Sequence, residues 1–350
     1  MTQAKRITSF HPPRRTLLGP GPSDMNPRVI ASLAQPVIGY LDPAFVTMME
    51  ELKELMRYAY QTTNPLTFPM SGPGSVGMEA CFVNLVEPGD KVIVCRNGVF
   101  GGRMLENVER CGGVPVVLEE TWGEPIDPNK LEALLKANPD TKVVAFVHAE
   151  TSTGAQSDAQ ALCDLARQHG ALTIVDCVTS LGGTPVAVDA WQADAVYSGS
   201  QKCLSCTPGL SPVSFSERAI TKVKSRTKGK VQSWFMDLNL VLAYWSETSR
   251  TYHHTAPGNS LYGLHEALLL LKEEGLENAW ARHRSNHEAL KAGLEAMGLK
   301  YLVKKEARLP QMNAVYIPEG VDDLAVRKTL LADYNIEIGA GLGPLAGKIW

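Results

Sequence analysis

The segment DAVYSGSQKCLSC (Asp194–Cys206) places a single lysine directly after a short apolar strand. Ala195, Val196 and Tyr197 are typical of a buried strand, and small polar residues follow them. Lys202 comes next, before the chain turns into a Pro/Gly-containing stretch. The sequence therefore predicts an ammonium group at the mouth of the protein core. A lone lysine is nearly always a surface group, so a functional role for Lys202 depends on which other residues lie near the end of this strand.

Apolar runs rich in β-branched residues alternate with amphipathic segments from about residue 40 to about residue 215. The runs that predict strands are KVIVC (91–95), VPVVL (114–118), KVVAFVHA (142–149) and ALTIVD (171–176). Helices are predicted over 44–60, 128–137 and 157–170. Continuous apolar strands joined by helices indicate an α/β fold with a largely parallel sheet covered on both faces. Ligands of such sheets collect beyond the carboxyl ends of the strands.

The chain has 350 residues, a length that favours two domains. The pattern changes after about residue 255 to helices over 260–274 and 276–298, a strand over 309–318 and a helix over 321–334. We expect an N-terminal arm (1–20), a large domain (21–255) and a smaller α+β domain (256–350). Ile349 and Trp350 resemble the start of a strand, so the small domain is expected to be incomplete.

Composition excludes several classes of partner. The hydrophobic fraction is 44%, the charged fraction 20% and the net charge −3, which describes an ordinary globular protein and argues against nucleic acid. No apolar run approaches the roughly 20 residues that cross a bilayer, so no membrane partner is expected. The seven scattered cysteines and the polar N-terminus predict a reducing, cytoplasmic compartment. A C-terminal organellar address would lie beyond Trp350.

Three chemical features coincide at predicted carboxyl ends of strands. The segment MSGPGSVGMEACFVNLV (70–86) places a Gly-rich turn before a helix, where free N–H groups and the helix dipole favour a phosphate. Asp176 ends the strand LTIVD, and Lys202 follows the strand DAVYS. A tight turn, a helix cap and a surface lysine would explain each feature alone. Together they match pyridoxal phosphate, which needs a phosphate cradle, an anion at its ring nitrogen and a Schiff-base lysine.

Beyond these features, the sequence resembles the class V aminotransferases of fold type I, and among them the alanine–glyoxylate/serine–pyruvate aminotransferase family. The resemblance covers nearly the whole chain. Its motifs are QTTNPLTFPMSGPGS, NGVFGGR, HAETSTG, VDCVTSLGGTPVAVD, YSGSQKCLSCTPG, YHHTAP and GLENAWARHR. It implies a fold with a seven-stranded, mostly parallel sheet in the large domain. It also implies ping-pong transfer of the amino group of alanine or serine to glyoxylate or pyruvate.

The resemblance also assigns roles to residues of the predicted site. Lys202 would bind the cofactor and, once released, act as the base, and Asp176 would pair with the pyridine nitrogen. Thr151 would lie near the phenolic oxygen of the cofactor. Phe100 would stack on the ring, at a position where many relatives carry tryptophan. The residues implied around the phosphate are Pro73, Gly74, Ser75 and Gln201.

Tyr252 and Thr255, in the motif YHHT, match residues that family members contribute to the phosphate site of the opposite subunit. The resemblance therefore implies a homodimer with composite active sites. The alternative is that Tyr252 is an aromatic side chain that packs against its neighbours and has no role in binding the cofactor.

The family places an arginine directly after the segment that corresponds to GKIW, and this arginine clamps the substrate carboxylate. The sequence stops at Trp350, so we expect the chain as given to lose much of its amino-acid affinity even where cofactor binds.

Cysteines and histidines near the motifs do not predict a metal site. Cys203 and Cys206 form a C-x-x-C pair, but no second pair or H-x₃₋₅-H follows, so both are interpreted as small buried side chains. Cys203, beside Lys202, is expected to make the protein sensitive to thiol reagents. His148 is interpreted as a packed or hydrogen-bonded side chain, and the adjacent pair at 253–254 points in different directions.

Three other functions remain open from the sequence. A ureidoglycine–glyoxylate aminotransferase is a close family neighbour, and one methylene or hydroxyl gives only about 1–3 kcal/mol of discrimination. A class V lyase, such as a cysteine desulfurase, would need a cysteine-bearing loop late in the chain, and no cysteine follows Cys206. An inactive scaffold is the third alternative, suggested by the arginine missing after Trp350.

Overall fold

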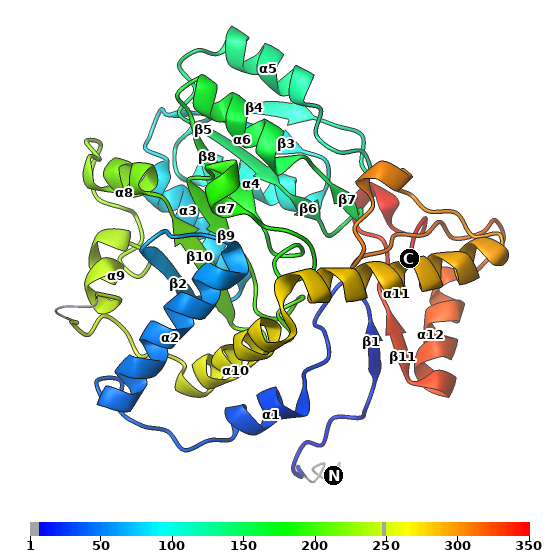
Figure 1. The fold of residues 1–350 in the computed structure, drawn as a ribbon. Helices are drawn as coiled ribbons and strands as arrows, with labels where there is room; N and C mark the ends of the chain where they lie inside the picture. The colour runs from blue at the N-terminus through cyan, green and yellow to red at the C-terminus, as the bar shows by residue number, and fades with distance from the viewer. Residues whose placement is uncertain (1–6, 247–249) are drawn as a thin grey trace, which may run out of the picture.

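A computed structural model describes residues 7–246 and 250–350, and its centre is a seven-stranded sheet (Figure 1). In spatial order the strands are β2 (Leu66–Ser71), β10 (Leu210–Phe215), β9 (Ala195–Tyr197), β8 (Leu172–Asp176), β5 (Val143–Val147), β3 (Lys91–Arg96) and β4 (Val114–Glu119). β10 runs antiparallel to both of its neighbours, and the other pairs are parallel. The predicted α/β fold with a mostly parallel sheet is confirmed.

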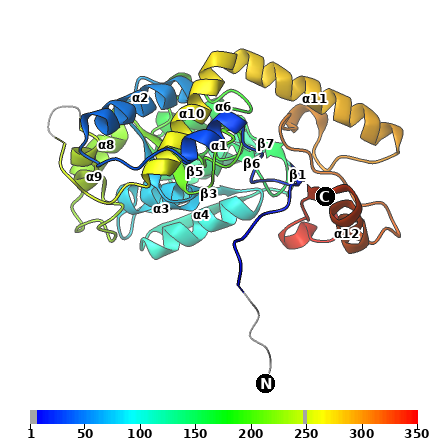
Figure 2. The same cartoon turned by 90° about the horizontal axis from the view of Figure 1, so that it is seen from below.

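Helices cover both faces of this sheet. α3 (Gly74–Leu85) and α4 (Val99–Arg110) pack on one face. α2 (Pro43–Tyr60), α6 (Ala159–Gln168) and α10 (Gly258–Glu274) pack on the other, and the two layers separate clearly in Figure 2. The shorter helices around them are α1 (Pro27–Leu33), α5 (Pro128–Ala137), α7 (Val188–Trp191), α8 (Glu217–Lys224) and α9 (Leu238–Tyr244).

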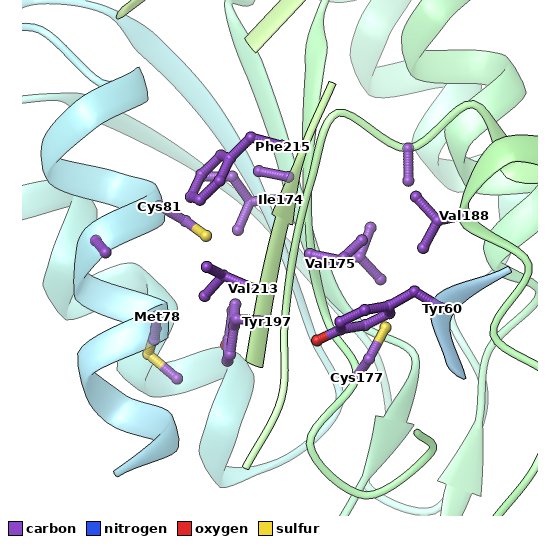
Figure 3. Close-up of a cluster of buried hydrophobic side chains, with 14 of the residues drawn as sticks. Tyr60, Met78, Cys81, Ile174, Val175, Cys177, Val188, Tyr197, Val213 and Phe215 are labelled. Atoms are coloured by element: carbon purple, nitrogen blue, oxygen red, sulfur yellow. The ribbon is translucent and has the colours of Figure 1, made fainter. Parts of the chain in front are cut away.

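Side chains of the central strands alternate between the two faces (Figure 3). Ile174 and Tyr197 point toward α3, whereas Val175 and Cys177 point to the opposite side. Residues two apart on a strand share a face, so Asp176 shares the α3 face with Ile174. The sheet thereby directs the carboxylate at the end of β8 toward the Gly-rich turn that begins α3.

One predicted buried strand lies at the sheet edge. β4 pairs only with β3 in the sheet order, and Val114 and Val117 are 48% and 37% exposed. Its apolar run resembles that of a central strand because apolar residues also occupy edges, so periodicity alone does not reveal a strand's place in the sheet.

The C-terminal part contains α11 (Leu276–Ala296), α12 (Asp323–Tyr334), β11 (Ile336–Ile338) and the short 3₁₀ turns at Lys305–Ala307 and Gly343–Leu345. β1 (Thr16–Leu18) pairs in parallel with β11, so residues of the N-terminal arm join this part. Buried side chains of α10, among them Leu264 and Leu268, belong instead to the main hydrophobic core. The expected boundaries at residues 20 and 255 stay a prediction.

The predicted strand over 309–318 is wrong. Only single-residue bridges form there, between Val315 and Tyr301 and between Tyr316 and Ile349. The segment contacts two different partners for one residue each, so no continuous ladder develops. Ile349, expected to begin a strand, contributes one of these bridges.

No helix within residues 7–246 and 250–350 has both the length and the apolar character needed to span a membrane. Over the same residues, no group of three or more His, Cys, Asp or Glu side chains is placed to hold a metal ion.

Candidate active site

Lys202 lies in the turn after β9, with its side chain directed under the N-terminal segment. Its Nζ donates a hydrogen bond to the carbonyl of Pro20, and Ser23 Oγ donates to the backbone carbonyl of Lys202 at 2.6 Å. Burial lowers the pKa of Lys202, and the nearby charge of Asp176 opposes that shift. The lysine is thus a partly desolvated amine within electrostatic range of a buried carboxylate.

Asp176 is only 2% exposed and both of its carboxylate oxygens accept hydrogen bonds. The backbone N–H of Val178 donates to Oδ1 at 2.8 Å, and the Tyr197 hydroxyl donates to Oδ2 at 2.7 Å. Burial raises the pKa of Asp176 to about 7, although these bonds and the Lys202 charge act in the opposite direction. At neutral pH the carboxyl is therefore poised between its two protonation states, and a cationic partner would favour the anion.

The N-terminus of α3 lies beside the end of β9. Pro73 occupies the N-cap position and supplies no side-chain hydrogen bond, so the first N–H groups of the helix are not capped by a side chain. A Cβ on Gly74 would lie 3.3 Å from Val178 Cγ2 and 3.4 Å from the Ser198 carbonyl oxygen. Gly74 therefore packs closely against these neighbours, while Ser75 next to it is exposed.

Gln201 completes the set of residues predicted around a phosphate. Its Oε1 lies close to Gly199, the residue that also faces Gly74. Gln201 Oε1 is buried and has no hydrogen-bond partner among the described residues. The structure thus brings Gln201 and the start of α3 to the same end of the sheet as Asp176.

Thr151 lies in the turn between β6 and β7, and Phe100 lies in the first turn of α4. The Thr151 hydroxyl hydrogen-bonds the hydroxyl of Thr179, which lies in the loop after Asp176. Phe100 is half-buried in the first turn of α4, and the guanidinium carbon of Arg103 lies 4.8 Å from its ring centroid.

Tyr252 and Thr255 lie on the surface. Tyr252 is 57% exposed, and its hydroxyl hydrogen-bonds Thr255 Oγ1 at 2.9 Å. The loop is tied to the end of β2 because His254 Nε2 and Ser71 Oγ lie 2.7 Å apart. Exposed side chains at this place suit the predicted role toward a second subunit, which stays a prediction.

Several residues at the site were not predicted from the sequence. Tyr197 could have been predicted, because it ends the strand next to β8 and pairs in register with Asp176. Thr179 lies within a quoted motif, yet nothing in its spacing marks it. Gln311 donates from Nε2 to the Thr179 carbonyl at 2.9 Å, and Pro20 accepts from Lys202. Both are long-range contacts with no local signature.

The expected reactivity of Cys203 is not supported by its surroundings. Cys203 is only half-buried, contrary to the expected burial, yet desolvation still raises the pKa of its thiol to about 12, so little thiolate exists at neutral pH. The thiolate is the reactive species, and Cys203 is therefore expected to react slowly with thiol reagents.

Comparison with known proteins places this geometry in a family. The model of the family described as "Aminotransferase class-V" matches residues 38–344. The chain belongs to the class V aminotransferases. It is 39% identical over 356 residues to the (S)-ureidoglycine–glyoxylate transaminase of Bacillus subtilis (strain 168), covering 97% of this chain and 85% of that protein.

Two alanine–glyoxylate aminotransferases show the same likeness. The protein of Rattus norvegicus is 39% identical over 340 residues, which cover 96% of this aminotransferase and 82% of the rat protein. The crystal structure from Nostoc sp. superposes with a TM-score of 0.96 at 46% identity, covering 100% of this chain and 92% of that one. The recognised family and fold are thereby confirmed, and the family is one that depends on pyridoxal phosphate. The roles of the individual residues stay predictions.

Asp176→Asn is expected to stabilise the cofactor-free protein at pH 8. The folded-state pKa of Asp176, about 7, lies above the unfolded value of 3.8, so ionisation of the buried group destabilises the fold increasingly from about pH 4 to pH 7. About three pKa units correspond to roughly 4 kcal/mol. Asparagine keeps an acceptor for Val178 N and a donor for the Tyr197 oxygen. Urea unfolding should show the largest gain above pH 7 and none near pH 4, and a gain independent of pH would contradict this account.

Tyr197→Phe is expected to weaken cofactor binding without unfolding the protein. The change removes the hydroxyl that stabilises the Asp176 anion, which raises the pKa of Asp176 further. A hydrogen bond to a charged group contributes about 1.5–3 kcal/mol, so pyridoxal phosphate should bind at least 10-fold more weakly in a fluorescence titration. Tyr60→Phe is the control, because Tyr60 is equally buried but donates to the Pro212 carbonyl. Equal losses in both variants would argue against the role of Tyr197.

Proposed function

We propose that this aminotransferase uses pyridoxal phosphate to move the amino group of alanine or serine to glyoxylate or pyruvate. The observation that carries the proposal is a partly desolvated lysine within electrostatic range of a buried carboxylate, at the end of the sheet where an uncapped helix begins. Each of these groups costs stability in the protein alone. All three match one ligand that carries an aldehyde, a basic ring nitrogen and a phosphate.

The described residues fit this cofactor. The N-terminus of α3 offers N–H groups without a side-chain cap, and such groups favour a phosphate. Gln201 lies beside this helix start, and the NH₂ of its amide would be the group that donates to a phosphate oxygen. Asp176 would hold the ring nitrogen, Lys202 the aldehyde carbon, and Thr151 would face the phenolic oxygen. Bound there, pyridoxal phosphate would supply an electron sink for the bond that loses its proton.

Lys202 has the properties that a shuttle for this proton needs. Burial lowers the pKa of its ammonium group, so a larger fraction of Nζ is neutral at working pH and able to accept a proton. The bond from Nζ to the Pro20 carbonyl shows that the side chain can be oriented toward the covering N-terminal segment. Asp176 is fixed by two donors, so it can keep a ring in place while Lys202 moves.

Glyoxylate as the acceptor has more support than any single donor. The three relatives compared above share glyoxylate in their names but differ between alanine and ureidoglycine as the partner. Alanine or serine is the donor proposed here, in line with the two alanine–glyoxylate relatives. Ureidoglycine is the second candidate, favoured by the transaminase of Bacillus subtilis.

A homodimer belongs to the same proposal. Tyr252 is exposed, and nearby Trp234 is 63% exposed while its ring stacks on His253 with centroids 4.5 Å apart. Large exposed aromatic side chains next to one another are typical of protein interfaces. A second subunit covering this loop would bring Tyr252 and Thr255 to a phosphate site across the interface. A reducing, cytoplasmic location is proposed with it, since the seven cysteines are unpaired.

Lys202→Ala is expected to abolish turnover and to leave the fold intact. The side chain packs at the edge of the core, so its removal should shift stability by no more than about 1 kcal/mol. Borohydride reduction should add the mass of the cofactor to the parent protein and none to the variant. Lys230→Ala, an exposed lysine, serves as the control and should be labelled like the parent. Turnover by Lys202→Ala would refute the assignment.

A donor screen on the purified protein tests the reaction itself. Alanine should bleach the visible absorbance of the bound cofactor, and glyoxylate should restore it, because a ping-pong reaction proceeds in two separable halves. Serine and ureidoglycine are compared with alanine at equal concentration. Sulfide release from cysteine would indicate the lyase, and absence of any spectral response would indicate a scaffold.

A further inference from the structure

Glu150 is a fully buried carboxylate to which the mechanism above gives no role. It lies in the motif HAETSTG on β6 (Ala149–Glu150), which pairs with β7 (Ala155–Gln156), and its exposed fraction is 0%. Ser152 turns back onto it, donating from its backbone N to Oε1 at 3.0 Å and from Oγ to Oε1 at 2.6 Å. Burial raises the pKa of Glu150, because desolvation disfavours the charged form of the carboxylate at this place.

The pair formed by Glu150 and Ser152 reaches the first turn of α4. Ser152 Oγ accepts a hydrogen bond from the backbone N–H of Val99 at 3.0 Å, and Val99 is the first residue of that helix. The N–H groups of Phe100 and Gly101 lie near enough to lower the pKa of the carboxylate, although Glu150 Oε2 has no partner at hydrogen-bond geometry among the described residues. A helix N-terminus favours a negative charge, so the carboxylate suits this place better than a neutral side chain would.

Gly98 shows how closely these groups fit together. It occupies the N-cap position of α4 and therefore has no side chain with which to cap the helix. A Cβ at this position would lie 2.3 Å from Glu150 Cδ and 2.5 Å from Ser152 Oγ. The cap is thus supplied from another loop, through space that only glycine leaves open. A first turn held in this way gives Phe100 a defined position.

We propose that Glu150 is a positioning residue that, through Ser152, fixes the first turn of α4 and so holds the ring of Phe100 over the cofactor. This inference rests on the proposed function, because Phe100 has a ring to stack on only where pyridoxal phosphate binds. The same loop carries Thr151, so one turn would orient both a stacking residue and a residue at the phenolic oxygen.

The charge of Glu150 has a second consequence at the site. Glu150 and Asp176 repel each other, which raises the pKa of Asp176, while Lys202 lowers it. The charge and the position of Glu150 must therefore be separated in any test. Glutamine removes the charge but keeps an oxygen that accepts from Ser152, whereas leucine removes both.

The experiment compares Glu150→Leu, Glu150→Gln and Ser152→Ala with the parent protein. Titration with pyridoxal phosphate measures affinity, and visible circular dichroism per bound cofactor reports how the ring is held. Glu150→Leu and Ser152→Ala should bind about 3- to 10-fold more weakly, the range set by one aromatic contact, and lose at least half of the visible dichroism. Glu150→Gln should stay within about twofold of the parent in both readouts.

Asp127→Ala is the matched control. The Asp127 side chain caps α5 by accepting from Asn129 N at 2.8 Å, so its removal loosens a helix N-terminus that carries no cofactor residue. It should lower the melting temperature and leave both cofactor readouts unchanged. Equal losses in Asp127→Ala, or parent-like values in Ser152→Ala, would overturn the role of Glu150.

The other possible results also distinguish a positioning role of Glu150 from its alternatives. If Glu150→Leu does not fold, Ser152→Ala alone provides the answer. Equal losses in Glu150→Gln and Glu150→Leu would assign the effect to charge and overturn a positioning role. A parent protein that binds no cofactor would overturn the proposed function, whereas a parent that binds and variants that behave like it would overturn this inference alone.

Discussion

The carboxylate of Asp176 is the constraint on which the arrangement of the site depends. A buried anion without a counter-ion destabilises a fold, and the raised pKa of Asp176 measures that cost. The protein nevertheless keeps the group at the end of a central strand and supplies two donors to it. Lys202 is near enough to affect the carboxyl but donates instead to Pro20. The stabilisation that Asp176 lacks is what a protonated ring nitrogen would provide.

The sheet explains why these groups meet. β8 and β9 are parallel neighbours, and their register pairs Asp176 directly with Tyr197. The carboxyl ends of both strands lie at the same end of the sheet, so the turn carrying Lys202 and the loop carrying Thr179 begin side by side. α3 starts at this end as well, because β2 runs antiparallel to β10, which in turn runs antiparallel to β9. The directions of the strands therefore bring together the carboxylate of Asp176, the turn that carries Lys202 and the start of α3.

The sequence predicts the position of a side chain best where that position follows from its own strand, while the roles of the site residues stay predictions. Asp176 and Lys202 could be predicted because each follows an apolar run, and parallel strands bring such ends together. Tyr197 could have been found by the same reasoning, had the register been considered. Gln311 could not, because its contact with the Thr179 carbonyl joins segments more than 100 residues apart. The strand expected over 309–318 does not form, for a related reason. Its partners, Tyr301 and Ile349, each pair with one residue only.

The same long-range contacts connect the C-terminal part of the chain to the site. Gln311 holds the Thr179 carbonyl from that side, and the Thr179 hydroxyl bonds Thr151. A Cβ on Gly183 would lie 2.9 Å from the side chain of Gln311 and 2.7 Å from Cys203 Sγ, so this packing is close. A shift of the C-terminal part would therefore act on Thr179 through Gln311, and on Lys202 through Pro20, which follows the strand β1 that pairs with β11. Asp176 is fixed by the sheet and its two donors, whereas the hydroxyl pair and the Lys202 amine depend on how the two parts of the chain are joined.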